Sequence, residues 1–149
     1  MFGAGISIHY FRTAATTVPA MNAELLRWNL IFAWGWILLG FLSGMLMGLC
    51  FHRENWLGGY GSWMRRLYRL GHISFFGLGM ANLLFFATVR ALPLAPALLN
   101  TASAGFLVGG ITMPVCTLLA AHWPKLRHLF AIPVISLLVA GVTTFIAIL

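Results

Sequence analysis

The residues of this sequence best suited to chemistry are two histidines at the ends of long apolar segments. His52 follows the first such segment, and His72 comes near the start of the second. A neutral imidazole can ligate a haem iron, and a b-type haem with two histidine ligands needs them on facing helices at equal depth. At matching ends of antiparallel neighbours, His52 and His72 would meet that need. The sequence therefore predicts them as the metal ligands of a haem b.

Three further residues suit the same cofactor. Gly48 belongs to a stripe of glycines at four-residue spacing that ends at His52, and Gly79 lies two turns after His72. Glycine leaves space for a flat macrocycle, and Arg69 can pair with a haem propionate. The alternative is that the glycines serve helix packing, the arginines set membrane topology and the histidines contact lipid headgroups.

Sulfur and imidazole side chains form a second candidate site. Thioether, thiolate and imidazole groups together favour Cu(I). The residues concerned are Met45, Met47, Cys50, His52, Met113 and Cys116. Methionine also fills gaps in apolar cores, and cysteine often behaves as a small hydrophobic residue. Copper or small-solute handling therefore stays an alternative.

Several function classes lack the residues they need. The only carboxylates are Glu24 and Glu54, and both lie outside the apolar segments. Ion-coupled transport and acid–base hydrolysis normally need ionisable groups inside the membrane or paired carboxylates. The net charge of +7 does not indicate nucleic acid, because the cations lie in loops between apolar segments. The sequence therefore favours a non-catalytic or electron-carrying chain over an independent enzyme.

The composition places the chain in a membrane. The 149 residues are 61% hydrophobic and 7% charged, against about 25% charged residues in soluble domains. Four apolar stretches each approach the roughly 20 residues that a membrane-spanning helix requires. They cover residues 28–50, 70–89, 97–121 and 129–149. These stretches do not alternate as barrel strands do, so we expect an all-α integral membrane protein with one domain over residues 1–149.

Charged and aromatic residues predict how the helices are oriented. Six lysines and arginines fall in the first and third loops, and three fall on the opposite side. By the positive-inside rule, those two loops face the cytoplasm and both termini face the other side. Short connections predict an up-down four-helix bundle, preceded by an interfacial segment over residues 1–27. The expected location is the inner membrane of a bacterium.

The apolar segments also carry residues suited to helix packing. Gly40, Gly44 and Gly48 would let another backbone approach closely. Pro114 removes a backbone donor, which frees the carbonyl of Gly110 for a hydroxyl or a water. The amide of Asn82 lies inside a span and must find a partner, so it predicts an interhelical hydrogen bond or a contact to a cofactor or quinone.

In size, predicted topology and histidine placement, the chain is similar to small multi-helix subunits of respiratory and photosynthetic complexes. This likeness assigns no role to any residue. It favours a small subunit of a larger electron-transfer assembly, whose partners are the lipid bilayer, other membrane subunits and possible quinone or pigment molecules. The alternative is a purely structural or assembly subunit without a cofactor.

Overall fold

The structure, a computed structural model, describes residues 20–92 and 94–149. Within these ranges it contains helices and no strand. Four helices are long and apolar enough to cross a membrane, which confirms the helical membrane class. Residues 1–19 of the predicted interfacial segment lie outside the described residues. In chain order, the elements are α2 (Ala20–Cys50), the 3₁₀ helix η1 (Trp56–Gly58), α3 (Trp63–Ala91), α4 (Pro96–His122), the 3₁₀ helix η2 (Pro124–Phe130) and α5 (Ala131–Ile148).

The second long helix begins earlier than hydropathy predicts. It starts at Trp63 rather than near Leu70. Ser62 precedes it in an extended conformation, and its Oγ accepts a hydrogen bond of 3.1 Å from the backbone N–H of Arg65. This is an N-terminal cap, which satisfies one of the free donors of the first turn. The arginines of this stretch therefore lie on a helix and not in a loop.

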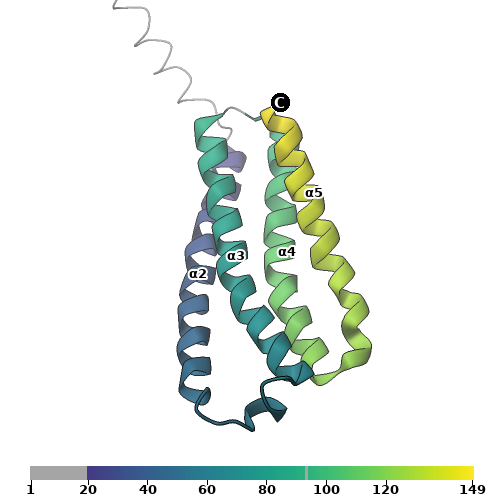
Figure 1. The fold of residues 1–149 in the computed structure, drawn as a ribbon. Helices are drawn as coiled ribbons and strands as arrows, with labels where there is room; N and C mark the ends of the chain where they lie inside the picture. The colour runs from purple at the N-terminus through teal and green to yellow at the C-terminus, as the bar shows by residue number, and fades with distance from the viewer. Residues whose placement is uncertain (1–19, 93) are drawn as a thin grey trace, which may run out of the picture.

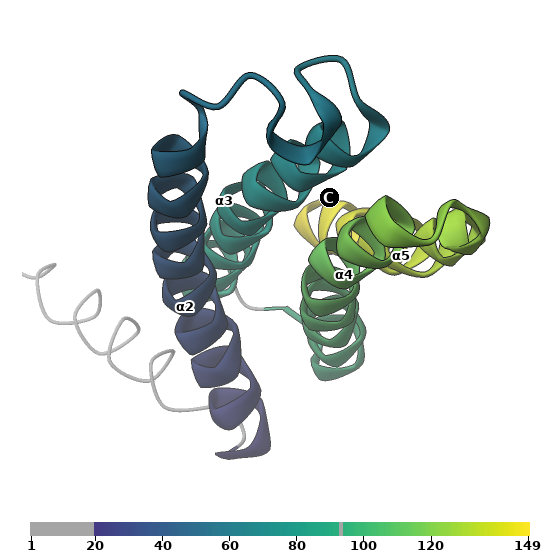
Figure 2. The ribbon, with the colours of Figure 1, turned by 90° about the horizontal axis from the view of Figure 1, so that it is seen from below.

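The helices form an open row rather than a closed ring. α3 packs between α2 and α4, α2 also reaches α4, and α5 packs along α4 with η2 (Figures 1 and 2). We call this order, α2–α3–α4–α5, the open row. Its two edge helices differ, because α2 contacts two long helices whereas α5 packs substantially against one.

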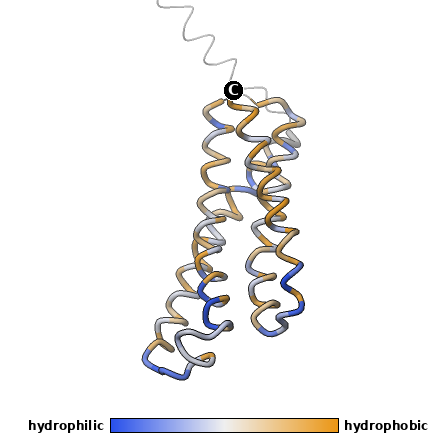
Figure 3. The backbone as a smooth tube through the Cα atoms, turned by 45° about the vertical axis from the view of Figure 1, so that its right-hand side comes forward, coloured by the Kyte–Doolittle hydropathy of each residue, from blue (hydrophilic) through white to orange (hydrophobic). Residues whose placement is uncertain are grey.

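Most of the cations lie at one end of the molecule, in two connections and in the first turns of α3. The α2–α3 and α4–α5 connections lie together at the bottom of Figure 1, away from the C-terminus and the α3–α4 connection. We call this the cationic end, and Figure 3 shows it as the main hydrophilic part of the chain. Its positive side chains are Arg53, Arg65, Arg66, Arg69, Lys125 and Arg127.

Glycines bring the helices of the row close together. A Cβ atom at Gly79 would lie 2.9 Å from the carbonyl oxygen of Ala33 on α2. One at Gly105 would lie 2.8 Å from the carbonyl oxygen of Ser136 on α5. Both contacts are to backbone, so small residues at these positions are needed for the observed packing.

Pro114 lies inside α4, and the carbonyl that it frees is used. The indole N–H of Trp36 on α2 donates a hydrogen bond of 3.0 Å to the oxygen of Gly110. The sequence predicted a hydroxyl or a water as the donor; the donor is instead the indole of Trp36. A proline in one helix thus makes a hydrogen-bond acceptor for another.

The edge helices expose most of their apolar surface. Only 17% of the most apolar part of α2 and 11% of that of α5 with its preceding turn is buried, against 33% for α3 and 39% for α4. Water would make this exposure costly, whereas lipid chains accept it. The distribution of burial therefore supports a bilayer environment.

Candidate functional site

His72 lies inside α3, where it faces α2. It is the tenth residue of the helix and is half-buried. Its Nδ1 atom lies 2.9 Å from the hydroxyl of Ser43, and its ring meets the ring of Phe76 edge to face at 5.6 Å. The position next to it on α2 is Gly44, where a Cβ would lie 2.8 Å from the imidazole. A glycine is therefore needed at position 44 for the imidazole ring to fit.

The hydroxyl of Ser43 has two polar neighbours. It lies 3.0 Å from the carbonyl oxygen of Gly40 and 2.9 Å from Nδ1 of His72, and the tautomer of the imidazole decides which group donates in the second contact.

His52 does not share the depth of His72. It lies in the turn after α2 and is exposed. The neighbour of His72 on α2 is Gly44, eight residues earlier, which corresponds to about 12 Å along a helix axis. The sequence placed both histidines at helix ends, but α3 begins nine residues before His72. Their positions therefore do not fit shared ligation of one iron, and haem binding stays a prediction.

The other predicted cofactor residues are also separated. Gly48 faces open space, with no atom within 4 Å of a Cβ built on it. Ala33 and Ile37 of α2 fill the space beside Gly79, so a macrocycle has no room there. Arg69 lies near the start of α3, with its guanidinium carbon 4.9 Å from the ring centroid of Tyr60.

The two cysteines of the predicted copper site lie on different helices. Cys116 is buried on α4, and its thiol donates a hydrogen bond of 3.4 Å to the carbonyl of Leu129. Cys50 is half-buried at the end of α2. In residues 20–92 and 94–149, no group of three or more His, Cys, Asp or Glu side chains is placed to hold a metal ion.

Arg65, predicted as one of the cations that set the membrane topology, is buried in the structure. Its side chain is only 3% exposed. The guanidinium carbon lies 4.8 Å from the ring centroid of Tyr60 and 5.5 Å from those of Phe51 and Trp56. Such cation–π contacts contribute about 2 kcal/mol when desolvated, which is less than the several kcal/mol that burial of an ion costs.

Arg65 also retains an unused donor. Its buried Nε finds no hydrogen-bond partner among the described residues. A buried donor without a partner is costly, and such groups in folded proteins usually mark a bound water, ion or ligand. Arg65 lines a cavity of about 540 Å³ together with Phe51, Glu54, Tyr60 and Arg69.

The loop that carries this cavity has a defined shape. Leu57, Gly58 and Gly59 have φ angles of 53°, 81° and 89°, a conformation that glycine adopts readily and leucine rarely. The hydroxyl of Ser62 donates a hydrogen bond of 2.5 Å to the carbonyl of Leu57 and also caps α3. One side chain thus connects the turn to the helix that bears Arg65.

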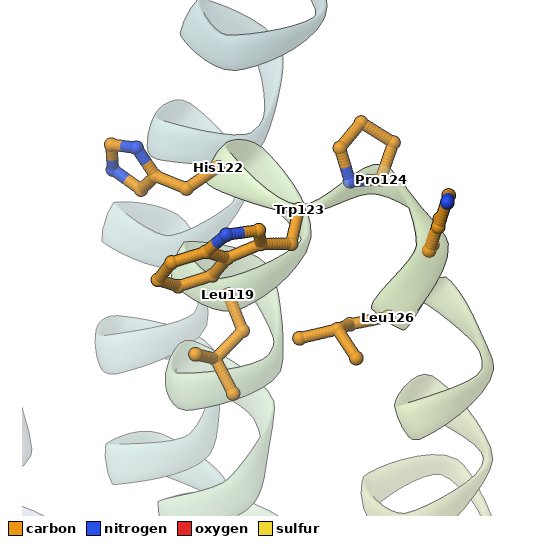
Figure 4. Close-up of a pocket in the computed structure, with 6 residues that line it drawn as sticks. Leu119, His122, Trp123, Pro124 and Leu126 are labelled. Atoms are coloured by element: carbon orange, nitrogen blue, oxygen red, sulfur yellow. The ribbon is translucent and has the colours of Figure 1, made fainter.

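A second cavity of about 640 Å³ lies between the end of α4 and η2. Figure 4 shows the indole of Trp123 near Leu119 and Leu126, with His122 above it. The Nε2 atom of His122 lies 3.1 Å from the hydroxyl of Tyr68 on α3, which links α3 to this corner. The lining is mostly apolar, and Lys125 adds one positive charge.

Away from the cationic end, three buried polar side chains connect three helices. Asn29 of α2 donates a hydrogen bond of 2.8 Å to Asn82 of α3 and accepts one from Ser103 of α4. Asn82 also donates to the carbonyl of Leu78 at 2.9 Å. All three side chains are fully buried. We call Asn29, Asn82 and Ser103 the polar triad.

Sequence reasoning found one member of the polar triad and missed the pairing. The predicted interhelical hydrogen bond of Asn82 is present. Asn29 is another amide in an apolar segment, but the sequence pattern does not show that it faces Asn82.

Comparison of the chain with protein-family models, curated proteins and solved structures found no match.

Proposed function

We propose that this chain is a small integral-membrane subunit that holds a larger membrane assembly together through the edges of its open row. The observation that carries the proposal is the position of α5, which packs substantially along α4 alone among the long helices. A helix with one neighbour offers a long face to another membrane-spanning chain. We place the helices as an up-down bundle with both termini on the non-cytoplasmic side.

Outward-facing glycines support an assembly role. Gly35 and Gly48 on α2 and Gly141 on α5 have no atom within 4 Å of a built Cβ. Small residues on a membrane helix let a second backbone approach, and glycine gives up apolar surface that lipid would otherwise contact. The edge helices thus retain packing positions that the chain itself does not use.

The proposed orientation is tested by cysteine labelling from each side of the membrane. With Cys50 and Cys116 replaced by Ala, we expect Gly61→Cys and Lys125→Cys to react with an impermeant reagent only from the cytoplasmic side. Arg90→Cys should react only from the other side. Labelling of the first two positions from opposite sides would overturn the proposed topology.

The assembly role is tested by size on a native gel after gentle solubilisation from the membranes that make the protein. Gly141→Leu should shift the chain from a large species to a small one, because the new side chain blocks the α5 edge. Gly77→Leu is the matched control, since it places the same side chain in equally open space on an inner helix. An unchanged size for Gly141→Leu, or equal loss in both variants, would contradict the proposal.

An electron-carrying subunit is the alternative, since His52, His72 and His122 all lie towards the cationic end. The difference in depth between His52 and His72 weighs against one iron held by both. The reduced-minus-oxidised spectrum of the purified chain tests this alternative, because bound haem b gives a b-type α-band. A band that disappears in His72→Ala would replace the structural role by electron transfer, with quinone or pigment as further candidate partners.

A carrier for copper or another small solute is the last alternative. It predicts transport by proteoliposomes that contain this chain alone, or copper retained at one equivalent after dialysis against a weak chelator. Among the described residues, no group of three or more His, Cys, Asp or Glu side chains supports a metal site.

A further inference from the structure

The cavity beside Arg65 is lined by more positive than negative side chains. Arg65 and Arg69 lie one helical turn apart on α3, and both guanidinium carbons lie within 5 Å of the Tyr60 ring centroid. Like charges in one lining repel each other, and a counter-ion between or beside them relieves this repulsion. Glu54 is the one carboxylate in the lining. The lining therefore carries one net positive charge.

The arrangement of donors fits a tetrahedral oxyanion. Guanidinium groups present several N–H donors in a plane and form strong, charge-assisted hydrogen bonds with phosphate oxygens. The buried Nε of Arg65 has no partner among the described residues, and Arg65 and Glu54 line the same cavity. Arg65 lies in the first turn of α3, where the helix dipole also favours negative charge.

We propose that this cavity binds a phosphodiester group, with Arg65 and Arg69 as its ligands. The group comes from the headgroup of a membrane phospholipid. The location supports this source, because the cavity lies at the cationic end among aromatic side chains, as expected at the membrane–water interface. Phe51, Glu54 and Tyr60 are exposed, so a headgroup can enter beside them.

The net charge of the lining also sets the preference among phosphates. A phosphodiester carries one negative charge, which balances the single positive excess. A phosphomonoester carries close to two charges near neutral pH, and Glu54 repels the second. The site therefore prefers a diester such as phosphatidylglycerol to a monoester such as phosphatidic acid, and Glu54→Gln should reduce that preference.

The test uses the full-length chain in detergent with defined lipids added, read by native mass spectrometry and by thermal unfolding. We expect one phosphatidylglycerol retained per chain and a rise in melting temperature on adding it. Arg69→Gln should weaken the affinity by about tenfold or more, because it removes a charge-assisted hydrogen bond. Arg69 is half-buried, so this variant keeps the fold that Arg65 substitutions put at risk.

Arg66→Gln is the matched control, because Arg66 is exposed, neighbours Arg65 in sequence and does not line the cavity. It should leave lipid retention unchanged. Equal weakening of lipid binding by Arg66→Gln and Arg69→Gln would mean that the lipid is held only by general attraction between charges. No weakening of lipid binding by either variant would exclude the site. Each of these two outcomes overturns the proposal.

Three further ligands distinguish a lipid headgroup from a soluble phosphate as the source of the bound group. Diacylglycerol, which lacks phosphate, should not be retained. Inorganic phosphate and glycerophosphoglycerol, which is the soluble diester headgroup without acyl chains, should raise the melting temperature only at far higher concentration than the lipid. If they act as strongly as phosphatidylglycerol, and Arg69→Gln removes that effect, the oxyanion site stands and its ligand is a soluble phosphate. Retention of diacylglycerol equal to that of phosphatidylglycerol would overturn the proposal.

Discussion

Two interfaces of the open row are built in different ways. The α2–α3–α4 interface combines close glycine contacts with several directional hydrogen bonds, among them the polar triad and the bond from Trp36 to Gly110. The α4–α5 interface uses glycine contacts at Gly105 and Gly109. The thiol of Cys116 on α4 adds a weak hydrogen bond to Leu129, which lies in η2 and not in α5. Directional bonds thus fix the register of three helices, whereas the contacts of α5 itself are mainly packing.

The difference matters because of the solvent. Lipid chains are as apolar as leucine, so burial of apolar surface gives little driving force between helices in a membrane. Packing and hydrogen bonds must supply the specificity. A helix held mainly by packing is easier to displace, which suits an edge that also contacts another chain.

The largest expected effect is at the α2–α3 contact. Gly79→Leu places a side chain against the backbone of Ala33, which cannot move aside without separating the helices. We expect a loss of at least about 3 kcal/mol of unfolding free energy, at the upper end of overpacking costs, or no folded protein. Gly77→Leu on the same helix is the control and should unfold normally in an SDS titration. Similar stability for both variants would show that close approach at Gly79 is not required.

The next effect is at the edge of the row. Gly105→Leu should separate α5 from α4 at a cost of about 1–3 kcal/mol, because its side chain meets the backbone of Ser136. Hydrogen exchange should then rise in α5 and stay low in α2 and α3. A simultaneous loss of protection in all four helices would mean that the two interfaces are one cooperative unit.

The smallest effect is expected for the hydrogen bond between Asn29 and Asn82. A double-mutant cycle with Asn29→Ala and Asn82→Ala should give a coupling free energy of about 0.6–2 kcal/mol, as measured for polar pairs between membrane helices. A matched cycle of Asn29→Ala with Thr88→Ala should give none, because Thr88 bonds only to its own helix, at Leu84. A coupling free energy near zero for Asn29 and Asn82 would mean that the polar triad does not distinguish the α2–α3–α4 interface from the α4–α5 interface.

Hydropathy predicted the helices well where an apolar segment and a helix coincide. The third helix was expected over residues 97–121 and runs from Pro96 to His122. The start of α3 was missed, because its first two turns are polar and depend on the Ser62 cap rather than on apolar residues. This error placed His72 at a helix end and, with it, at the depth of His52.

The candidate site was predicted less well, since it depends on how helices face one another. The sequence showed that Asn82 needs a partner, but not that Asn29 supplies it, because apolar segments do not encode register. Arg65 was expected at the surface with the other cations. Its burial depends on three aromatic side chains that close over it from the loop between α2 and α3.

The open row also constrains how copies of this chain can associate with one another. Its edges are different surfaces, α2 at one side and α5 at the other. Contact of one copy's α5 with the next copy's α2 is head-to-tail, so it gives a ring when the rotation closes and an open chain when it does not. Contact between two like edges, α5 with α5 or α2 with α2, is two-fold and stops at a pair. The number of copies in a self-assembled particle therefore distinguishes contact between like edges from contact between unlike edges.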